Sequence, residues 1–482
     1  MAVFNGKTYA GTSSAVGCAV WRRDSSAWTK VSTDGFGDCD NDTARCMAVQ
    51  GGYLYAGTSN QLTGCEVWRY NGSAWAQVNV DGFGDPGNTV ASSMAVFGSN
   101  LYVGTSNTAT GCEVWRYDGG SWTQVNADGF GDPTNTVAGS MAVFDSNLFT
   151  GTSNTATGCE VWRFDGIGFS QVNADGFGDA GNHATSSMAV YQSGLFVGTL
   201  NAIAGGEVWR TTGPDEAPFS DWTQVNANGF GSAQNRSVDS MAVFNLRLHA
   251  GTTKTSFGAE VWQYDGIAWS QSNTDGFGDV DNLSVRSMVV NGPNLFAGTL
   301  NGVTGCEIWR TSIPPPAITS ITPATGALGS TVSVSDLAGT GFYGEPRVEL
   351  INGQATITAT DVSVISSTRV TCKLTIPGDV QTGLWDVRVQ NPDGQSAQLD
   401  DGFRVYDPTP TFYFAEGTCR PDFDPYICVQ NPGSSEAAVT ITYMKGDGTT
   451  SEEQITVGAN SRSTVRVKDT LGEADDPAHD FS

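Results

Sequence analysis

A block of about 47 residues recurs from the start of the chain to residue 310, and it limits the possible folds more than any other feature. Between Met94 and Ser140, four short apolar runs alternate with turn residues. The methionines that open the repeated phrase are Met1, Met47, Met94, Met141, Met188, Met241 and Met288. A fixed period of this length is typical of solenoids, propellers and repeat arrays.

Each unit is predicted to form four strands. The runs MAVF and LYVGT flank a short polar turn, which indicates a hairpin, and CEVWRY and SWTQVN follow with a DG or NG turn between them. Helical repeats are disfavoured because no helical pattern of ten or more residues occurs. Four strands of four to six residues match one propeller blade, and seven copies of the GT dipeptide are present. We therefore expect an all-β fold with a seven-bladed β-propeller over residues 1–313.

The two ends of the repeat region are uneven. The last copy has no SWTQVN strand, and the first has nothing before MAVF. If the ring closes through a shared blade, that strand comes from upstream of Met1, so we expect a truncated N-terminus with any export signal ahead of it. Where the chain ends, at Ser482, the final module also looks short.

Charge and hydropathy exclude two classes of partner. The formal net charge is −26 and no basic block occurs, so a nucleic-acid backbone would be repelled. No apolar run reaches the eighteen residues or so that a membrane span needs.

The repeat ends at a proline linker, residues 314–316, and the sequence that follows is unrelated to the repeat. Ile321, Pro323 and Gly326, the GTGF of residues 339–342 and the DVRVQNPDG of residues 386–394 resemble the IPT/TIG family of immunoglobulin-like domains. That resemblance implies a β-sandwich over residues 314–407 that serves as a spacer or adhesive module and carries no catalytic residues. Alternating runs between glycine and proline turns favour a sandwich independently.

Residues 408–482 resemble the FAEG-type β-sandwich modules of large bacterial surface proteins. The repeat region itself resembles kelch-like bacterial propellers in period and blade pattern. It lacks their double-glycine signature, so this likeness is architectural and implies no activity.

Two sets of polar residues fall on one face of the expected propeller, because the second-to-third-strand loops and the links between blades share that face. Asparagines in the loops are candidate ligand-binding residues: Asn60, Asn107, Asn154, Asn201 and Asn301. The DGFGDxxN links offer carboxylate and amide oxygens for calcium: Asp81, Asp85, Asn88, Asp128, Asp132, Asn135, Asp175, Asp179 and Asn182. Ordinary Asx turns explain the same residues, so no cofactor is required and calcium is the alternative.

The other recurring side chains are interpreted as structural. The tryptophans of CEVWR are expected to pack between blades, and its arginines to pair with nearby carboxylates. The cysteines of that run occupy a position that needs a small side chain, whereas Cys39 with Cys46, and Cys419 with Cys428, are close enough in sequence to pair. His183, His249 and His479 are too scattered to form a metal or catalytic cluster.

These features favour a non-enzymatic binding or adhesion protein, extracellular or at the cell surface, that displays a propeller on immunoglobulin-like spacers. Its ligand would be a carbohydrate or a protein. One alternative is a carbohydrate-active propeller enzyme, which would be expected to break the repeat at its site. The other is a purely structural surface-layer component.

Overall fold

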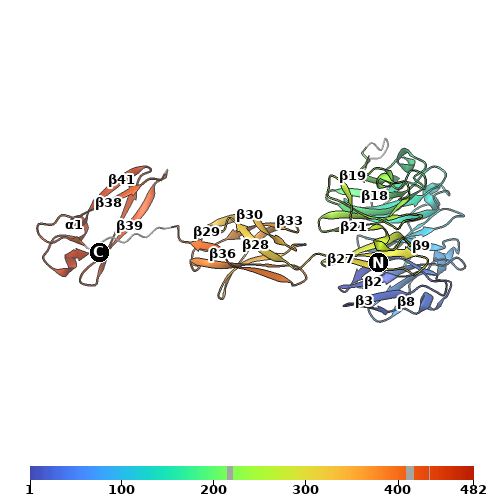
Figure 1. Cartoon of the computed structure of the whole chain (residues 1–482), viewed down its shortest axis with the longest axis horizontal. Helices are drawn as coiled ribbons and strands as arrows, with labels where there is room; N and C mark the ends of the chain where they lie inside the picture. The colour runs from blue at the N-terminus through green and yellow to red at the C-terminus, as the bar shows by residue number, and fades with distance from the viewer. Residues whose placement is uncertain (214–220, 409–416, 434, 482) are drawn as a thin grey trace. The chain divides into compact units, whose positions relative to one another are not determined.

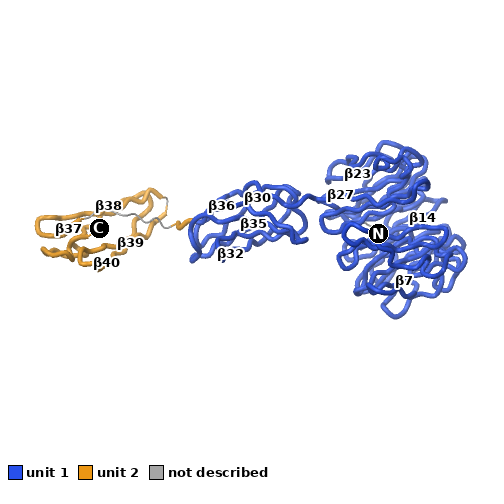
Figure 2. Tube along the Cα trace, turned by 60° about the horizontal axis from the view of Figure 1, so that its bottom comes forward, with its two compact units in different colours: residues 1–405 blue, residues 406–482 orange. Residues whose placement is uncertain are grey.

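The computed structural model describes residues 1–213, 221–408, 417–433 and 435–481. These residues divide into two compact units, Met1–Val405 and Tyr406–Ser482 (Figure 2). The fifth repeat is longer than the others by an insertion around Gly213 to Pro218, most of which lies outside the described residues. So does most of the FAEG sequence at 414–417.

The repeats form seven successive antiparallel groups of strands, so the all-β, propeller-like prediction is confirmed (Figure 1). The first strands of the groups are β1 (Ala2–Phe4), β5 (Thr43–Gln50), β9 (Val90–Phe97), β13 (Val137–Phe144), β17 (Ala184–Tyr191), β21 (Ser237–Phe244) and β25 (Asn282–Asn291). The second strands are β2 (Lys7–Gly11), β6 (Tyr53–Ser59), β10 (Asn100–Ser106), β14 (Asn147–Ser153), β18 (Gly194–Leu200), β22 (Arg247–Thr253) and β26 (Asn294–Asn301).

The third strands carry the CEVWR sequence. They are β3 (Val20–Asp24), β7 (Val67–Tyr70), β11 (Val114–Tyr117), β15 (Val161–Phe164), β19 (Val208–Thr211), β23 (Val261–Tyr264) and β27 (Ile308–Ser312). Six groups have a fourth strand, namely β4 (Ala27–Lys30), β8 (Trp75–Gln77), β12 (Trp122–Gln124), β16 (Phe169–Gln171), β20 (Thr223–Gln224) and β24 (Trp269–Gln271). In the seventh group β27 is the outer edge, as the missing SWTQVN run predicts.

The first strands surround the centre of the repeat region. Each lies beside the first strand of the next group, and β1 lies against both β5 and β25. A single bridge joins the second strands β6, β10, β14, β18 and β22 to the next first strand, such as Ser106 to Val137. Between the last and first groups, Asn291 Nδ2 donates to Gly6 O at 3.0 Å and to Thr8 Oγ1 at 3.1 Å. The seven groups therefore form a closed ring.

The DGFG links are short 3₁₀ turns: η1 (Asp34–Gly37), η2 (Asp81–Gly84), η3 (Asp128–Gly131), η4 (Asp175–Gly178), η5 (Asn228–Gly231) and η6 (Asp275–Gly278). In η2, Phe83 has φ 59°, a conformation that costs a non-glycine residue about 1–2 kcal/mol. Its ring stacks on Trp115 at 4.9 Å and meets Trp122 edge-on at 5.0 Å, contacts worth about 0.5–1.5 kcal/mol each. Aromatic packing between blades therefore offsets the backbone strain, in agreement with the packing predicted for these tryptophans.

Residues 317–406 form two sheets over one core. The order of the first sheet is β28 (Ala317–Thr322), β30 (Thr331–Thr340), β34 (Arg369–Thr375) and β33 (Thr360–Ser366). The order of the second is β29 (Thr325–Ala327), β36 (Ser396–Tyr406), β35 (Gly383–Gln390), β31 (Arg347–Asn352) and β32 (Ala355–Thr358). Trp385, Phe342 and Phe403 are fully buried in their shared core. A two-sheet packing is what the alternating runs of this region predict.

The described residues of the second unit form three two-stranded pairings. They join β37 (Gly417–Thr418) to β42 (Asp480–Phe481), β38 (Tyr426–Asn431) to β41 (Ser461–Arg466), and β39 (Ala437–Met444) to β40 (Thr450–Val457). The short helices α1 (Val467–Leu471) and η7 (Pro477–His479) follow β41. Among the described residues, no helix combines the length and the apolar character that crossing a membrane requires.

Candidate functional site

The second-to-third-strand loops and the DGFGDxxN links interlock around the repeat region, and we call them together the loop belt. Cys112 N donates to Asn135 O at 2.8 Å, and Gly129 N donates to Cys112 O at 2.8 Å. Gly64 approaches the next link so closely that a Cβ built on it would lie 2.6 Å from Gly82 Cα. Only glycine fits there, which explains why all seven loops have a glycine at this position.

The predicted ligand-binding asparagines lie inside the loop belt. Asn107 Nδ2 donates to Asp85 Oδ2 at 3.0 Å and to Asn88 Oδ1 at 3.3 Å. Its Oδ1 accepts from the backbone N–H groups of Ala109 and Thr110. Asn60, Asn154, Asn201 and Asn301 make the same kinds of contact, and all five are at most 5% exposed. The amides thus hold each loop to the preceding link and are not presented to solvent.

The predicted calcium ligands are also engaged. Asp85 Oδ1 accepts from Gly87 N at 2.8 Å, and Asn88 is fully buried. Asp81 lies at the other end of the link, where its Oδ1 accepts from Gln77 at 2.8 Å. The corresponding contacts of Asp128, Asp132, Asn135, Asp175, Asp179 and Asn182 are the same in kind. An ion would have to displace these hydrogen bonds, so the residues do not fit a ready calcium shell, and calcium binding stays a prediction.

A different acidic group offers three close ligand atoms. Within the described residues, Asp38, Cys39 and Asp40 form the one set of three His, Cys, Asp or Glu side chains whose ligand atoms lie within 4.8 Å of one another. Cys39 and Asp40 are exposed, and Asp38 Oδ1 already accepts from Asp40 N. We assign no metal to it.

Each link is fixed to the next third strand by a buried glutamate. Glu113 is 6% exposed, and its Oε2 accepts from Asn88 Nδ2 at 2.7 Å and from Trp115 Nε1 at 2.6 Å. Burial raises the pKa of Glu113, while these two donors act in the opposite direction. Glu66 and Glu160 have the same contacts and the same raised pKa. The glutamate and the tryptophan of the CEVW sequence therefore have a structural role.

The sixth repeat replaces the loop asparagine by Lys254. This lysine is 7% exposed, and its ammonium contacts Glu260 Oε1 and lies 3.3 Å from Asp275 Oδ2. This buried ion pair joins the loop to the third strand and the following link, whereas the asparagines of the other loops hold them to the preceding link.

The repeat arginines, cysteines and histidines differ in part from expectation. Arg22 pairs with Asp24 at 2.7 Å as predicted, but Arg69 lies 4.6 Å above the Tyr53 ring.

Cys18, Cys65, Cys112 and Cys159 are buried free thiols, as expected for a small-residue position. The suggested pairs Cys39–Cys46 and Cys419–Cys428 are wrong in this structure. Cys46 Sγ contacts Ala91 O at 3.0 Å, and Cys428 is exposed while Cys419 is buried. The histidines lie apart, His249 in β22, His479 in η7 and His183 in the link before β17.

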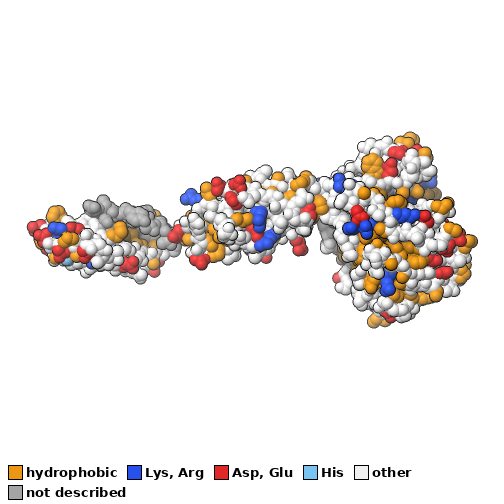
Figure 3. Space-filling view, turned by 90° about the horizontal axis from the view of Figure 1, so that it is seen from below, with side chains coloured by type: hydrophobic (Ala, Val, Ile, Leu, Met, Phe, Trp, Pro, Cys, Tyr) orange, Lys and Arg blue, Asp and Glu red, His pale blue; other side chains and the backbone are white. Residues whose placement is uncertain are grey.

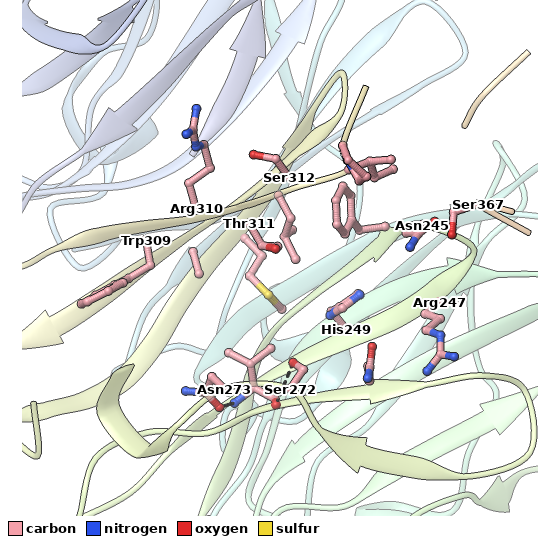
Figure 4. Close-up of a pocket in the computed structure, with 18 of the residues that line it drawn as sticks. Asn245, Arg247, His249, Ser272, Asn273, Trp309, Arg310, Thr311, Ser312 and Ser367 are labelled. Carbon is pink, nitrogen blue, oxygen red and sulfur yellow. Dashed lines mark hydrogen bonds between the residues drawn. The ribbon is translucent and has the colours of Figure 1, made fainter. Parts of the chain in front are cut away.

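A cavity of about 970 Å³ borders the three-stranded last group (Figure 4). Trp309 and Arg310 of β27 line it together with Arg247 and His249 of β22. Trp309 is 37% exposed and Cys306 is exposed, whereas fourth strands and links cover their equivalents in the complete groups. Burial lowers the pKa of His249 to about 4, so its ring is neutral near pH 7. The cavity thus marks the open edge of β27.

The loop belt presents apolar side chains at its outer tips. Val16, Leu62, Ile203, Phe257 and Val303 are 63–85% exposed, and each lies in a second-to-third-strand loop. Figure 3 shows hydrophobic side chains among acidic ones on the surface of the repeat region. Neighbouring apolar groups exposed on a rigid scaffold indicate an interaction surface.

Sequence reasoning missed one further position, the residue two before each methionine. It is the extra residue of a β-bulge in six first strands, for example between Ala138 and Ser140 where β13 pairs with β14. We call these residues the bulge ring: Arg45, Ser92, Gly139, Ser186, Asp239 and Arg286. A column-by-column comparison of the repeats would have found it, because three of the six residues are charged.

No family model and no curated protein matches this chain. Among solved structures, the SapL1 lectin in complex with α-methyl fucoside is similar to 56% of this chain and 96% of its own, with 13% identity and a TM-score of 0.37. The six-bladed fucose-recognising lectin of Aleuria aurantia has 14% identity over 57% of this chain and 97% of its own, with a TM-score of 0.36. The WD40 repeats of RRP9 have 11% identity over 62% and 86%, with a TM-score of 0.37. Likenesses this distant carry no function across, so the propeller-like assignment rests on the strand pairing described above.

Proposed function

We propose that this chain is a non-enzymatic binding protein, extracellular or at a cell surface, that displays a seven-bladed propeller on sandwich spacers. In this proposal residues 314–407 are an IPT/TIG immunoglobulin-like domain and residues 408–482 a FAEG-type module. The observation that carries the proposal is the set of exposed apolar loop tips on one face of the repeat region. Leaving such side chains in water costs free energy that docking of a partner recovers.

The loop tips favour a protein partner. Leu62, Ile203 and Val303 occupy the same place in three loops. Each loop is held by hydrogen bonds to the side chain of its asparagine, such as Asn60. Because the loops are fixed before binding, little conformational entropy is lost on association. Aliphatic side chains offer contact area but no hydrogen bonds, which suits an apolar patch on a protein.

A carbohydrate is the second candidate ligand, and Phe257 favours it. This ring is 63% exposed at the tip of the Lys254 loop. An exposed aromatic ring on a fixed loop can stack on the apolar face of a sugar, and Asp275 of the adjacent link supplies an acceptor for its hydroxyls.

The test is a binding screen on glycan and cell-surface protein arrays, followed by two matched variants. Leu62→Asp, Ile203→Asp and Val303→Asp together should weaken binding of a protein hit by about a hundredfold or more, as expected for central contact residues. Ile167→Asp with Ile267→Asp alters side chains that are even more exposed, 93% and 90%, in third-to-fourth-strand turns at the opposite end of the sheets. We expect this control to bind normally.

Two results would overturn the proposal. Unchanged binding by the loop-tip variant, with loss in the control, would move the site to the opposite face. Turnover of a glycoside that a single carboxylate substitution abolishes would make the chain an enzyme.

A further inference from the structure

The bulge ring lies on the first strands, which surround the centre of the repeat region. Its residues are partly or fully exposed, while the residue before each is buried, such as Ala138 before Gly139. A Cβ built on Gly139 would meet only Thr185 O at 3.4 Å and Val137 Cγ1 at 3.6 Å. Bulges re-aim a side chain that a regular strand would turn elsewhere. Here they interrupt the alternation of side chains at one position in each of six first strands.

Charge is confined to three of these six positions. Arg45 lies on β5, Asp239 on β21 and Arg286 on β25, whereas the remaining bulge residues are two serines and a glycine. The first strands β21, β25, β1 and β5 follow one another around the ring, so the three charges gather on one side of the centre. Two positive charges and one negative charge give this patch a net positive charge in a chain of net charge −26.

Asp239 and Arg286 are already linked. Asp239 Oδ2 accepts from Ser284 Oγ at 2.8 Å and from Thr253 Oγ1, and it lies 3.7 Å from Arg286 Nε. The carboxylate is thus fixed by two hydroxyls and holds one edge of the Arg286 guanidinium.

Arg45 has no hydrogen bond or ion pair with any residue that the structure describes. Partial burial lowers its pKa, and the positive charge of Arg286 contributes in the same direction. Two guanidinium groups near each other are unfavourable by themselves, but they form a strong site when an oxyanion lies between them, because each can donate two parallel N–H bonds.

We propose that the bulge ring binds an oxyanion, a carboxylate, sulfate or phosphate group, between Arg45 and Arg286, with Asp239 orienting Arg286. This site is separate from the loop tips. It explains why an otherwise regular repeat changes from small residues to charged ones at a bulge position.

The experiment is calorimetric titration of the full chain with inorganic phosphate, sulfate and acetate at constant ionic strength set with chloride. We expect one site for at least one of these anions and a matching rise in melting temperature. Arg45→Ala and Arg286→Ala should each weaken it about tenfold or more, as expected for loss of a charge-assisted bidentate contact. Arg116→Ala, on β11 outside the bulge ring, should bind like the wild type. If acetate is the one anion that binds, the ligand is a carboxylate, which the proposal includes.

Arg45→Lys is the second variant if an alanine variant misfolds. It keeps the charge and loses the planar fork, so we expect intermediate affinity. No binding of any anion by the wild type at millimolar concentration would overturn the proposal. Wild-type affinity in Arg45→Ala and Arg286→Ala would also overturn it. So would a loss of affinity in Arg116→Ala as large as the loss in those two variants.

Discussion

The loop belt and the bulge ring belong to the same repeat, but residues of the loop belt recur from repeat to repeat, whereas those of the bulge ring change. In the loop belt, Asn107 and Glu113 have counterparts with the same contacts in most groups, and these side chains are buried. In the bulge ring the residue ranges from glycine to arginine, and its contacts change from one repeat to the next: Asp239 accepts from two hydroxyls, whereas Arg45 is exposed. A residue whose neighbours recur must recur with them, whereas a residue without fixed neighbours is free to suit a ligand. The comparison therefore separates scaffold from candidate site.

We expect the largest loss of stability when a tryptophan side chain that packs on a link is removed. Trp115→Ala loses the stack on Phe83 and the hydrogen bond to Glu113, so we expect a loss of about 3–5 kcal/mol in unfolding free energy. Urea denaturation measures it. Trp309→Ala is the matched control, because Trp309 is 37% exposed on the open edge of β27 and should lose clearly less. Equal losses would mean that the fourth strand adds nothing to this packing.

A smaller loss is expected from a single loop amide. Asn107→Ala removes two accepted and two donated hydrogen bonds and leaves backbone N–H groups without acceptors, at a cost of about 1–3 kcal/mol. Thermal melting followed by circular dichroism checks it. An unchanged melting curve with lost ligand binding would restore Asn107 as a ligand-binding residue.

The smallest effect concerns pH. Burial raises the pKa of Glu113 above its ordinary 4.5, so its contribution to folding is full below pH 4.5 and is lost as pH rises through the higher folded value. Glu113→Gln can still accept both hydrogen bonds and does not titrate. We therefore expect its stability relative to the wild type to improve from pH 4 to pH 7 in parallel denaturation series. A constant difference across that range would contradict a raised pKa.

The sequence predicts the strands better than it predicts the contacts. The period and the turn residues locate four strands in each unit, but the first strand begins at Val90, four residues before the methionine that marks it. Those four residues contain the bulge at Ser92, which depends on register against β10 and has no local signature. Loop asparagines such as Asn107 are predicted to be accessible because they follow strands. They are buried because two links from distant parts of the repeat close over them.

One paired measurement tests the separation of scaffold from site most directly. It is the unfolding free energy of Asn107→Ala and of Arg45→Ala, obtained from urea denaturation under the same conditions. We expect Asn107→Ala to lose about 1–3 kcal/mol and Arg45→Ala to remain within about 0.5 kcal/mol of the wild type. A loss in Arg45→Ala as large as that in Asn107→Ala would show that the bulge arginine belongs to the scaffold, and the account would be wrong.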